Sequence, residues 1–327
     1  MVRQEGTLVM LVQSVDTIPV PTLPARSRRG HPVVYADRLF LKALVVMGVK
    51  RLTTIYELLA VLEQDTPEMT ALRPLLMQEG QCPSRRTWER RVAALLGRLP
   101  AIIGCLGRHL VAVLNPWRDH ARAAAIDSTT LPAKGGVWHK KDRMAGVVPH
   151  TSIDTEAGWT KSGWHGWVYG WKLHLVCAAG PVWLPLAAEL TPAPEADNAV
   201  APRLIRELPD DLRFLLGDQH YRDADLVTLC AARSCVLVAP TGGPYPHTDD
   251  GVAVRRLLHK TRSATSETFN EQFKGIFDGH AHVPTRGMAA TQRYALGAIF
   301  VYQLVVLQRH QQGADLRIGL KAFLRAA

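Results

Sequence analysis

Cysteine is scarce in this chain, and the few residues present exclude two classes of small protein. The five cysteines are Cys82, Cys105, Cys177, Cys230 and Cys235, an odd number that contains no C-x-x-C pair. Neither a disulfide scaffold nor a zinc finger fits that spacing. We therefore expect reduced thiols in a cytoplasmic protein.

Long apolar runs are also missing. The longest run, from Tyr294 to Leu307, includes Gln303 and falls short of the roughly 20 residues needed to cross a bilayer. The run from Leu8 to Val12 is too short for the core of a signal peptide. We find no internal repeat. The sequence therefore predicts no membrane partner, and it assigns residues 294–307 to a buried helix.

Acidic residues are outnumbered. The 327 residues include 39 Lys and Arg against 29 Asp and Glu, a formal net charge of +10, and the excess is concentrated toward the N-terminal third. Such a balance favours a polyanionic partner, most often nucleic acid. The length predicts two domains, and a hydrophobic fraction of 47% is that of an ordinary globular protein.

The N-terminal part divides into a lead-in and a helical region. Residues 1–32 contain three prolines before the basic stretch 26–30, which predicts a flexible basic lead-in. This arm is either simply solvated or touches DNA phosphates. Residues 33–116 have helical periodicity, and Asn115-Pro116 marks a domain boundary.

One helix of this region is strongly basic. Ser84 is a candidate N-cap, and Trp88 and Val92 belong to an apolar stripe. Four arginines cover the opposite surface: Arg85, Arg86, Arg90 and Arg91. Two interpretations stay open. The helix either contacts DNA in a helix-turn-helix-like domain or is an ordinary surface helix with solvated arginines.

After residue 116 the periodicity changes to that of an α/β domain. Three strands, which we expect to be antiparallel, are followed by helix, strand, helix, strand and helix. The predicted strands are 122–126, 167–176, 182–190, 214–216 and 236–239. This order matches a ribonuclease-H-like mixed sheet flanked by helices, which we assign with C-terminal helices to residues 117–327.

The connecting segments of this domain carry basic residues. Residues 131–166 lack periodicity and are predicted to be a long loop that includes Lys140 and Lys141. Asp197 and Asn198 are predicted to cap the first helix of the domain. A basic loop containing Arg262 is predicted to precede the last helix.

Three carboxylates occupy corresponding positions in the predicted fold. Asp127 ends the first strand, Asp218 ends the fourth, and Glu267 lies on the last helix. In a ribonuclease-H-like fold these elements converge at one edge. Two Mg²⁺ ions held by few carboxylates would suit phosphodiester chemistry, with Mn²⁺ as a substitute. Glu271, one turn after Glu267, is the alternative third ligand.

The motifs around these carboxylates resemble those of insertion-sequence transposases of the DDE class. The similarity covers roughly residues 120–310. The segments that carry it are Ile126-Asp127-Ser128-Thr129, Gly170-Trp171-Lys172-Leu173-His174, Gly217-Asp218-Gln219-His220-Tyr221 and Glu267 through Lys274, with Arg262 upstream. Each motif alone is weak, and together they are specific.

The resemblance implies a transposase that binds terminal inverted repeats, cleaves DNA and transfers the cut strand. It implies that Asp127, Asp218 and Glu267 hold the metal ions. It also implies DNA or phosphate contacts from Lys172, His220, Arg262 and Lys274, alongside those predicted for the arginines and Lys140 and Lys141. The partners would be double-stranded DNA and a second copy in a paired-end complex, at a bacterial nucleoid. Two rivals stay open: a ribonuclease-H-like nuclease without strand transfer, and a catalytically silent DNA-binding protein.

Overall fold

The computed structural model describes residues 6–21, 35–117, 122–163, 166–180, 182–239, 249–277 and 281–325, with the backbone alone for residues 249–255. The predicted basic stretch 26–30 lies outside these residues. The chain divides into two compact units, Met1–Leu106 with Gln292–Ala327 and Gly107–Thr291. The functional division into DNA-binding and catalytic domains stays a prediction, because compact units record only which residues pack together.

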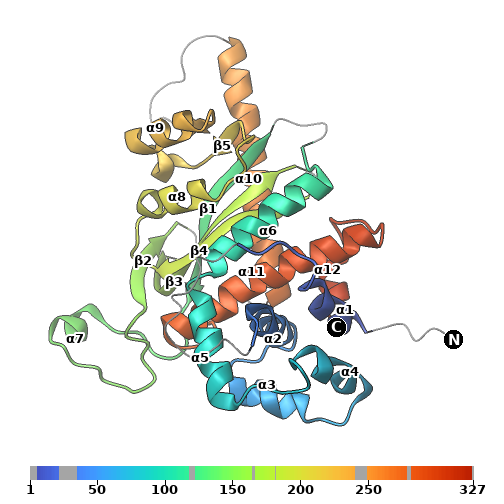
Figure 1. Cartoon of the computed structure of the whole chain (residues 1–327). Helices are drawn as coiled ribbons and strands as arrows, with labels where there is room; N and C mark the ends of the chain where they lie inside the picture. The colour runs from blue at the N-terminus through green and yellow to red at the C-terminus, as the bar shows by residue number, and fades with distance from the viewer. Residues whose placement is uncertain are drawn as a thin grey trace, which may run out of the picture. The chain divides into compact units, whose positions relative to one another are not determined.

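The first unit is helical (Figure 1). Its helices are α1 (Thr7–Ser14), α2 (Asp37–Val49), α3 (Ile55–Leu62), α4 (Pro67–Leu75), α5 (Arg85–Leu96) and α12 (Leu320–Arg325). Two further helices, α6 (Leu99–Leu114) and α11 (Met288–Gln311), span the division between the units. Helix α1 lies in the predicted lead-in, and it forms because its apolar residues Leu8, Leu11 and Val12 are buried.

Side-chain caps start several of these helices. Thr54 and Glu57 form a reciprocal capping box at α3, and Ser84 accepts a hydrogen bond from the Thr87 amide at the start of α5, as predicted. Residues 294–307 lie in α11 and are largely buried, also as predicted. Among the described helices none alone could cross a membrane, and α5 with α6 reaches the required length and hydropathy only as a bent pair.

The second unit is built on a six-stranded mixed sheet. Its strands are β1 (Ala123–Pro132), β2 (Gly158–Ser162), β3 (Gly166–Ala179), β4 (Leu184–Pro192), β5 (Phe214–Leu216) and β6 (Val236–Val238). Strand β3 pairs antiparallel with β1, β2 and β4, whereas β5 is parallel to both β1 and β6. The path β4-β3-β1-β5-β6 is that of a ribonuclease-H-like sheet, so the predicted fold class is confirmed.

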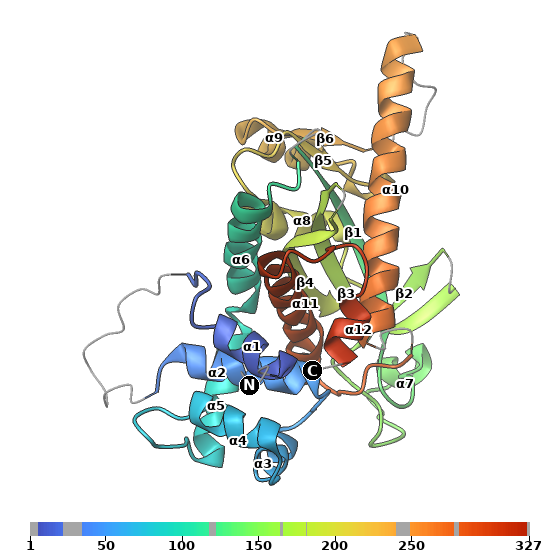
Figure 2. The ribbon, with the colours of Figure 1, turned by 90° about the vertical axis from the view of Figure 1, so that its right-hand side faces the viewer.

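Helices cover the two faces of this sheet. These are α8 (Asp197–Arg206), α9 (Ala224–Ala232) and α10 (Asp249–Phe277). Figure 2 shows α10 along one side of the sheet, with α8 and α9 on the other. Buried Phe269 and Phe273 anchor α10, and buried Val200 and Leu204 anchor α8. Helices α10 and α8 therefore bring their polar residues to opposite sides of the central strand β1.

Three local predictions were wrong. The predicted loop 131–166 contains the end of β1, the short helix α7 (Lys140–Met144) and β2, because the long strand β3 provides a partner for β2. Arg262 is not in a loop, since α10 begins at Asp249. Asp197 does not cap α8 with its side chain; Ala196 occupies the N-cap position, and the Asp197 carboxylate contacts basic residues of β3.

Candidate active site

Asp127 lies where β1 stops being fully buried. The four preceding residues, Ala123 to Ile126, are almost inaccessible. Asp127 projects from the face that α10 covers, where Ser266 forms a hydrogen bond with its carboxylate and the Arg262 Nη1 lies 3.9 Å from its Oδ2. Burial raises the pKa of Asp127 to about 6, although these two contacts and the Ser128 amide oppose the shift.

Asp218 reaches the same edge from β5. Leu216 pairs with Ala125 in parallel register, so Asp218 lies beside Asp127 two residues further on. The negative charge of Asp218 contributes to the raised pKa of Asp127. Gly217 permits the tight turn that joins β5 to the following 3-10 helix, Gln219–Tyr221. A Cβ atom at residue 217 would lie 2.8 Å from the Tyr221 Cβ, so a larger residue would not fit.

His220 is held against Asp218. The Asp218 Oδ1 accepts a hydrogen bond from the His220 amide at 2.9 Å, and its Oδ2 lies 3.0 Å from the His220 Nδ1. This contact raises the pKa of His220, since the protonated ring is paired with a carboxylate. His220 is largely exposed. The structure therefore places this predicted DNA contact directly at the candidate site.

Glu267 is not brought to the two aspartates. It follows Ser266, and successive residues of a helix point about 100° apart, so its side chain leaves the face that meets Asp127. Glu267 and Glu271 are both exposed. Lys274 is buried, and burial lowers its pKa. Within the described residues, no group of three acidic, histidine or cysteine side chains is arranged to hold a metal ion.

Two of the three predicted ligands nevertheless fit a divalent cation. The carboxylates of Asp127 and Asp218 are hard oxygen donors from neighbouring strands, and their negative charges oppose each other at a partly buried edge. A divalent cation would relieve that repulsion. The donor set therefore suits a divalent cation, although these two carboxylates are not joined by a third in the structure.

A second polar cluster lies on the opposite face of β1. Ser128 pairs with His174 of β3, and both project away from α10 because side chains alternate along a strand. Asp197 joins them from the start of α8. Its Oδ1 lies 3.3 Å from the His174 Nδ1 and 3.4 Å from the Lys172 Nζ. The Lys172 Nζ also donates a hydrogen bond to the Glu195 carbonyl at 2.8 Å.

This cluster is buried and charged. Burial alone would raise the pKa of Asp197, but His174, Lys172 and Ser128 lower it to about 2. Sequence analysis did not predict this cluster: it interpreted Asp197 as a helix cap and named His174 only within the motif Gly170–His174. The available signal was the alternation of Lys172 and His174 with Leu173 and Leu175, which places two basic side chains on one face of a predicted strand.

The basic residues predicted to contact DNA fall into two groups. Arg85, Arg86 and Arg90 are exposed on α5, and Lys140 and Lys141 are exposed on α7. Arg91 differs, since only 11% of its side chain is exposed and its Nη2 donates to the Asp37 Oδ1 at 2.6 Å. Lys172 is similarly occupied by Asp197. The structure therefore leaves these two side chains engaged within the protein.

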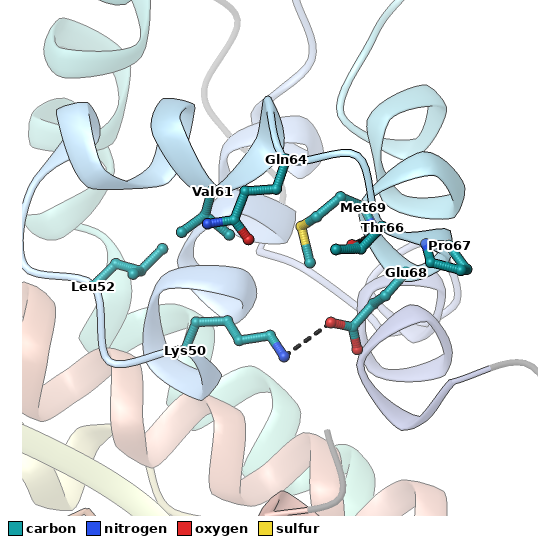
Figure 3. Close-up of a pocket in the computed structure, with 8 residues that line it drawn as sticks. All are labelled: Lys50, Leu52, Val61, Gln64, Thr66, Pro67, Glu68 and Met69. Atoms are coloured by element: carbon teal, nitrogen blue, oxygen red, sulfur yellow. Dashed lines mark hydrogen bonds and ion pairs between the residues drawn. The ribbon is translucent and has the colours of Figure 1, made fainter.

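A surface cavity of about 500 Å³ lies in the helical unit (Figure 3). The side chains of Lys50 and Glu68 point toward each other across it and form an ion pair of 2.9 Å. Its other lining residues are Leu52, Val61, Gln64, Thr66, Pro67 and Met69. None of them is a predicted site residue, so this cavity adds nothing to the candidate active site.

Comparison with known proteins identifies a family to which this chain is similar. Residues 119–304 match the family model of the transposase DDE domain. No curated protein matches the chain. Two solved structures have weak overall similarity. One is a piggyBac transposase synaptic complex with hairpin DNA (9% identity; 97% of this chain and 75% of that chain; TM-score 0.42). The other is a Mos1 transposase paired-end complex with the left transposon end (12%; 93% and 82%; TM-score 0.22).

The domain match covers more than half of the chain and contains all three predicted metal ligands. Its limits enclose the whole sheet and the helix that approaches Asp127. The resemblance noted from the sequence motifs is thereby confirmed, and the chain belongs to the DDE-domain transposases.

Proposed function

We propose that this transposase binds the terminal inverted repeats of its element, cleaves the strand ends and joins the 3′ ends to target DNA. The observation that carries the proposal is the placement of Asp127 and Asp218 at one edge of the sheet beside Arg262. Work on such DNA would place the protein at the nucleoid. A homodimer that pairs the two ends is part of the proposal.

Asp127 and Asp218 would hold the divalent cation, with Glu267 as the proposed third ligand and Glu271 as the alternative. When bound, such a cation activates water or a 3′-hydroxyl and stabilises the leaving oxygen. Two Mg²⁺ ions, with Mn²⁺ as a substitute, remain the expected cofactors. Glu267 must turn toward Asp127 to take part, because Ser266 occupies that direction in the structure.

The surrounding residues would position the DNA. Arg262 is 17% exposed and directs its positive charge to the same edge as Asp127, where a phosphate would sit. His220, paired with Asp218, is exposed on the outer side of that edge. Lys274 is a further proposed phosphate contact at the end of α10. We leave Lys172 out of direct DNA contact, because Asp197 and the Glu195 carbonyl already bind its ammonium group.

Exposed arginines of α5 would hold the element ends through their phosphates. Arg86 and Arg90 are exposed for this; Arg85 is also exposed and forms a surface ion pair of 2.8 Å with Glu89, which a phosphate would have to replace. Lys140 and Lys141 would add contacts from α7. We exclude Arg91, whose guanidinium pairs with Asp37. Such contacts give affinity that falls steeply with salt.

The test uses DNA that flanks the coding region, where terminal inverted repeats would identify the substrate. Asp127→Asn and Asp218→Asn should each lower cleavage at least about 100-fold, since metal binding supplies several kcal/mol to such reactions. End binding should change less than about twofold. Near-normal cleavage by either variant in Mg²⁺ would refute the proposed site. Cleavage without joining of pre-cut ends would instead support the nuclease alternative.

A further inference from the structure

A two-stranded hairpin extends beyond the rest of the sheet. Strand β3 pairs with β1 only from Gly170 onward and with β4 only from Trp171 onward. Residues 166–169 of β3 therefore pair with β2 alone. In Figure 2 β2 lies at the edge of the sheet, with α7 below it.

One face of this hairpin carries an inner and an outer cross-strand pair. Trp159 pairs with Tyr169, and Lys161 pairs with Trp167, so all four side chains share a face. The inner pair is covered: the rings of Trp159 and Tyr169 lie 5.3 Å apart, and the Trp159 Nε1 donates to the Trp138 carbonyl at 2.8 Å. The outer pair is exposed, and 68% of Trp167 is accessible.

Basic residues lie beside this exposed indole and on the neighbouring helix α7. Lys161 lies directly across from it on the neighbouring strand. The loop that covers Trp159 also brings up His139, whose ring lies 6.4 Å from the Trp159 ring, and α7 begins at the next residue. Lys140, Lys141 and Arg143 of α7 are exposed. We call Trp167, Lys161, Lys140 and Lys141 the hairpin surface.

A flat exposed ring beside ammonium groups suits one kind of ligand. Aromatic side chains stack on nucleobases while neighbouring cations hold the phosphates. Within a duplex the base faces are covered by their neighbours, so a protein ring can reach them only where strands end or separate. We propose that Trp167 stacks on an unpaired nucleobase at a DNA end, with Lys161 and the α7 lysines on the adjacent phosphates. This inference rests on the proposed function.

The positive charge of this surface argues against a second copy of this chain as its binding partner. The loop also exposes Met144, Val147 and Val148, which could pack against protein. Lys140, Lys141, Arg143 and Lys161 nevertheless outnumber the exposed or half-buried acids of this region, Asp142 and Glu156, so self-pairing of the surface would bring like charges together. A polyanion carrying a flat apolar ring complements both features.

The experiment measures binding of the full chain without divalent cations to three DNA probes. They are a blunt duplex, the same duplex with a four-nucleotide 3′ overhang, and that overhang made abasic. The wild-type chain should prefer the overhang with bases by at least about fivefold, since stacking contributes about 1–3 kcal/mol per base. Trp167→Ala should remove this preference, leaving blunt-duplex affinity within about twofold.

Two variants serve as controls. Trp167→Phe should retain most of the preference, because a phenyl ring still stacks. Val227→Ala removes an exposed apolar side chain from α9 and should change nothing. Lys161→Ala should weaken all three complexes alike and reduce the salt dependence of binding by about one phosphate contact.

Several outcomes would overturn the inference. One is equal wild-type affinity for the overhangs with and without bases. Another is an equal loss by Trp167→Ala on all three probes. The third is loss of self-association in Trp167→Ala without DNA, measured by light scattering, which would assign the surface to a second copy. If wild-type protein binds no probe at all, the proposed function fails too; if it binds but Trp167→Ala has no effect, only this inference fails.

Discussion

Ser266 of α10 forms a hydrogen bond with Asp127 of β1 and so occupies the direction from which a third carboxylate would approach. The single proton of the Ser266 hydroxyl can alternatively go to the Arg262 carbonyl one turn earlier, whose oxygen lies 3.1 Å away. The rotation of α10 about its own axis therefore decides whether Glu267, the next residue, can reach Asp127.

The first prediction concerns the third ligand. Glu267→Gln should eliminate cleavage and strand transfer, because the amide cannot supply the charge of a metal ligand. Glu271→Gln should reduce both only partly, since Glu271 lies beside Lys274 and affects its pKa. Both variants are measured on uncut and pre-cut ends across a Mg²⁺ titration.

Ser266→Ala is the matched control for this comparison. Removing the hydroxyl should lower activity by no more than about 100-fold, since a hydrogen bond to a carboxylate contributes about 1.5–3 kcal/mol and every proposed metal ligand stays in place. An active Glu267→Gln together with an inactive Glu271→Gln would reverse the assignment.

The second prediction links the active site to stability. The pKa of Asp127 is raised from 3.8 to about 6, so the native state holds this proton more tightly than the unfolded chain. Stability associated with the protonated carboxyl is therefore present below about pH 4 and is lost as the pH rises through about 6. Asp127→Asn removes that loss.

Without metal, Asp127→Asn should be more stable than wild type at pH 7.5 by about 2–3 kcal/mol, and most of the difference should disappear near pH 4. Thermal unfolding in EDTA across this pH range measures it. Asp225→Asn, at an exposed position of α9 in the same unit, is the control and should show no such pH dependence. A destabilised Asp127→Asn at pH 7.5 would contradict the prediction.

The third prediction separates DNA contact from structural support on α5. Replacing Arg85, Arg86 and Arg90 by alanine should reduce the slope of log affinity against log salt by about 2–3, because three phosphate contacts are lost. An unchanged slope would move the contact elsewhere, most plausibly to residues 134–143.

Arg91→Ala should behave differently. Hydrogen bonds from Arg98 and Arg91 lower the pKa of Asp37 against the effect of burial, and the Arg91 guanidinium also lies 4.7 Å from the Phe40 ring. Its loss should cost about 1–3 kcal/mol of stability and leave the salt slope unchanged. Urea unfolding and salt-dependent binding of the same preparation compare the two effects.

The fourth prediction tests the cluster on the far face of β1. The pKa of Asp197 is lowered to about 2, so its ionised form contributes stability above about pH 4 that is lost as the pH falls toward 2. The free-energy difference between wild type and Asp197→Asn should be about 1–2 kcal/mol at neutral pH and should shrink through this window. A difference independent of pH would mean that the carboxylate is not held by Lys172 and His174.

The sequence correctly predicts the position of site residues that follow an apolar strand segment. Asp127 and Asp218 could be placed together because each follows a short apolar run, and parallel strands bring such ends to one edge. The direction of Glu267 could not be predicted, since it depends on the rotation of a 29-residue helix about its axis. The start of that helix was also missed: the basic residues between 255 and 262 were interpreted as a loop, although Val254, Leu257 and Leu258 recur at helical spacing.

Two basic residues show the same limit in another form. The composition of α5 places Arg91 with three exposed arginines, and only the packing of α2 reveals its pairing with Asp37. Lys172 resembled a free phosphate-binding cation because its partner Asp197 is distant in sequence. Local periodicity does not predict which side chains pair across separate elements.

The helical unit is discontinuous in sequence, and this determines how it can be isolated. Within that unit, the Gln303 Nε2 of α11 donates to the Ile103 carbonyl at 3.0 Å, and Arg293 donates to the Thr53 carbonyl. A fragment ending near residue 115 would lose these bonds and expose the apolar residues that α11 covers. An isolated form of the helical unit would therefore need both segments, with a linker in place of residues 107–291.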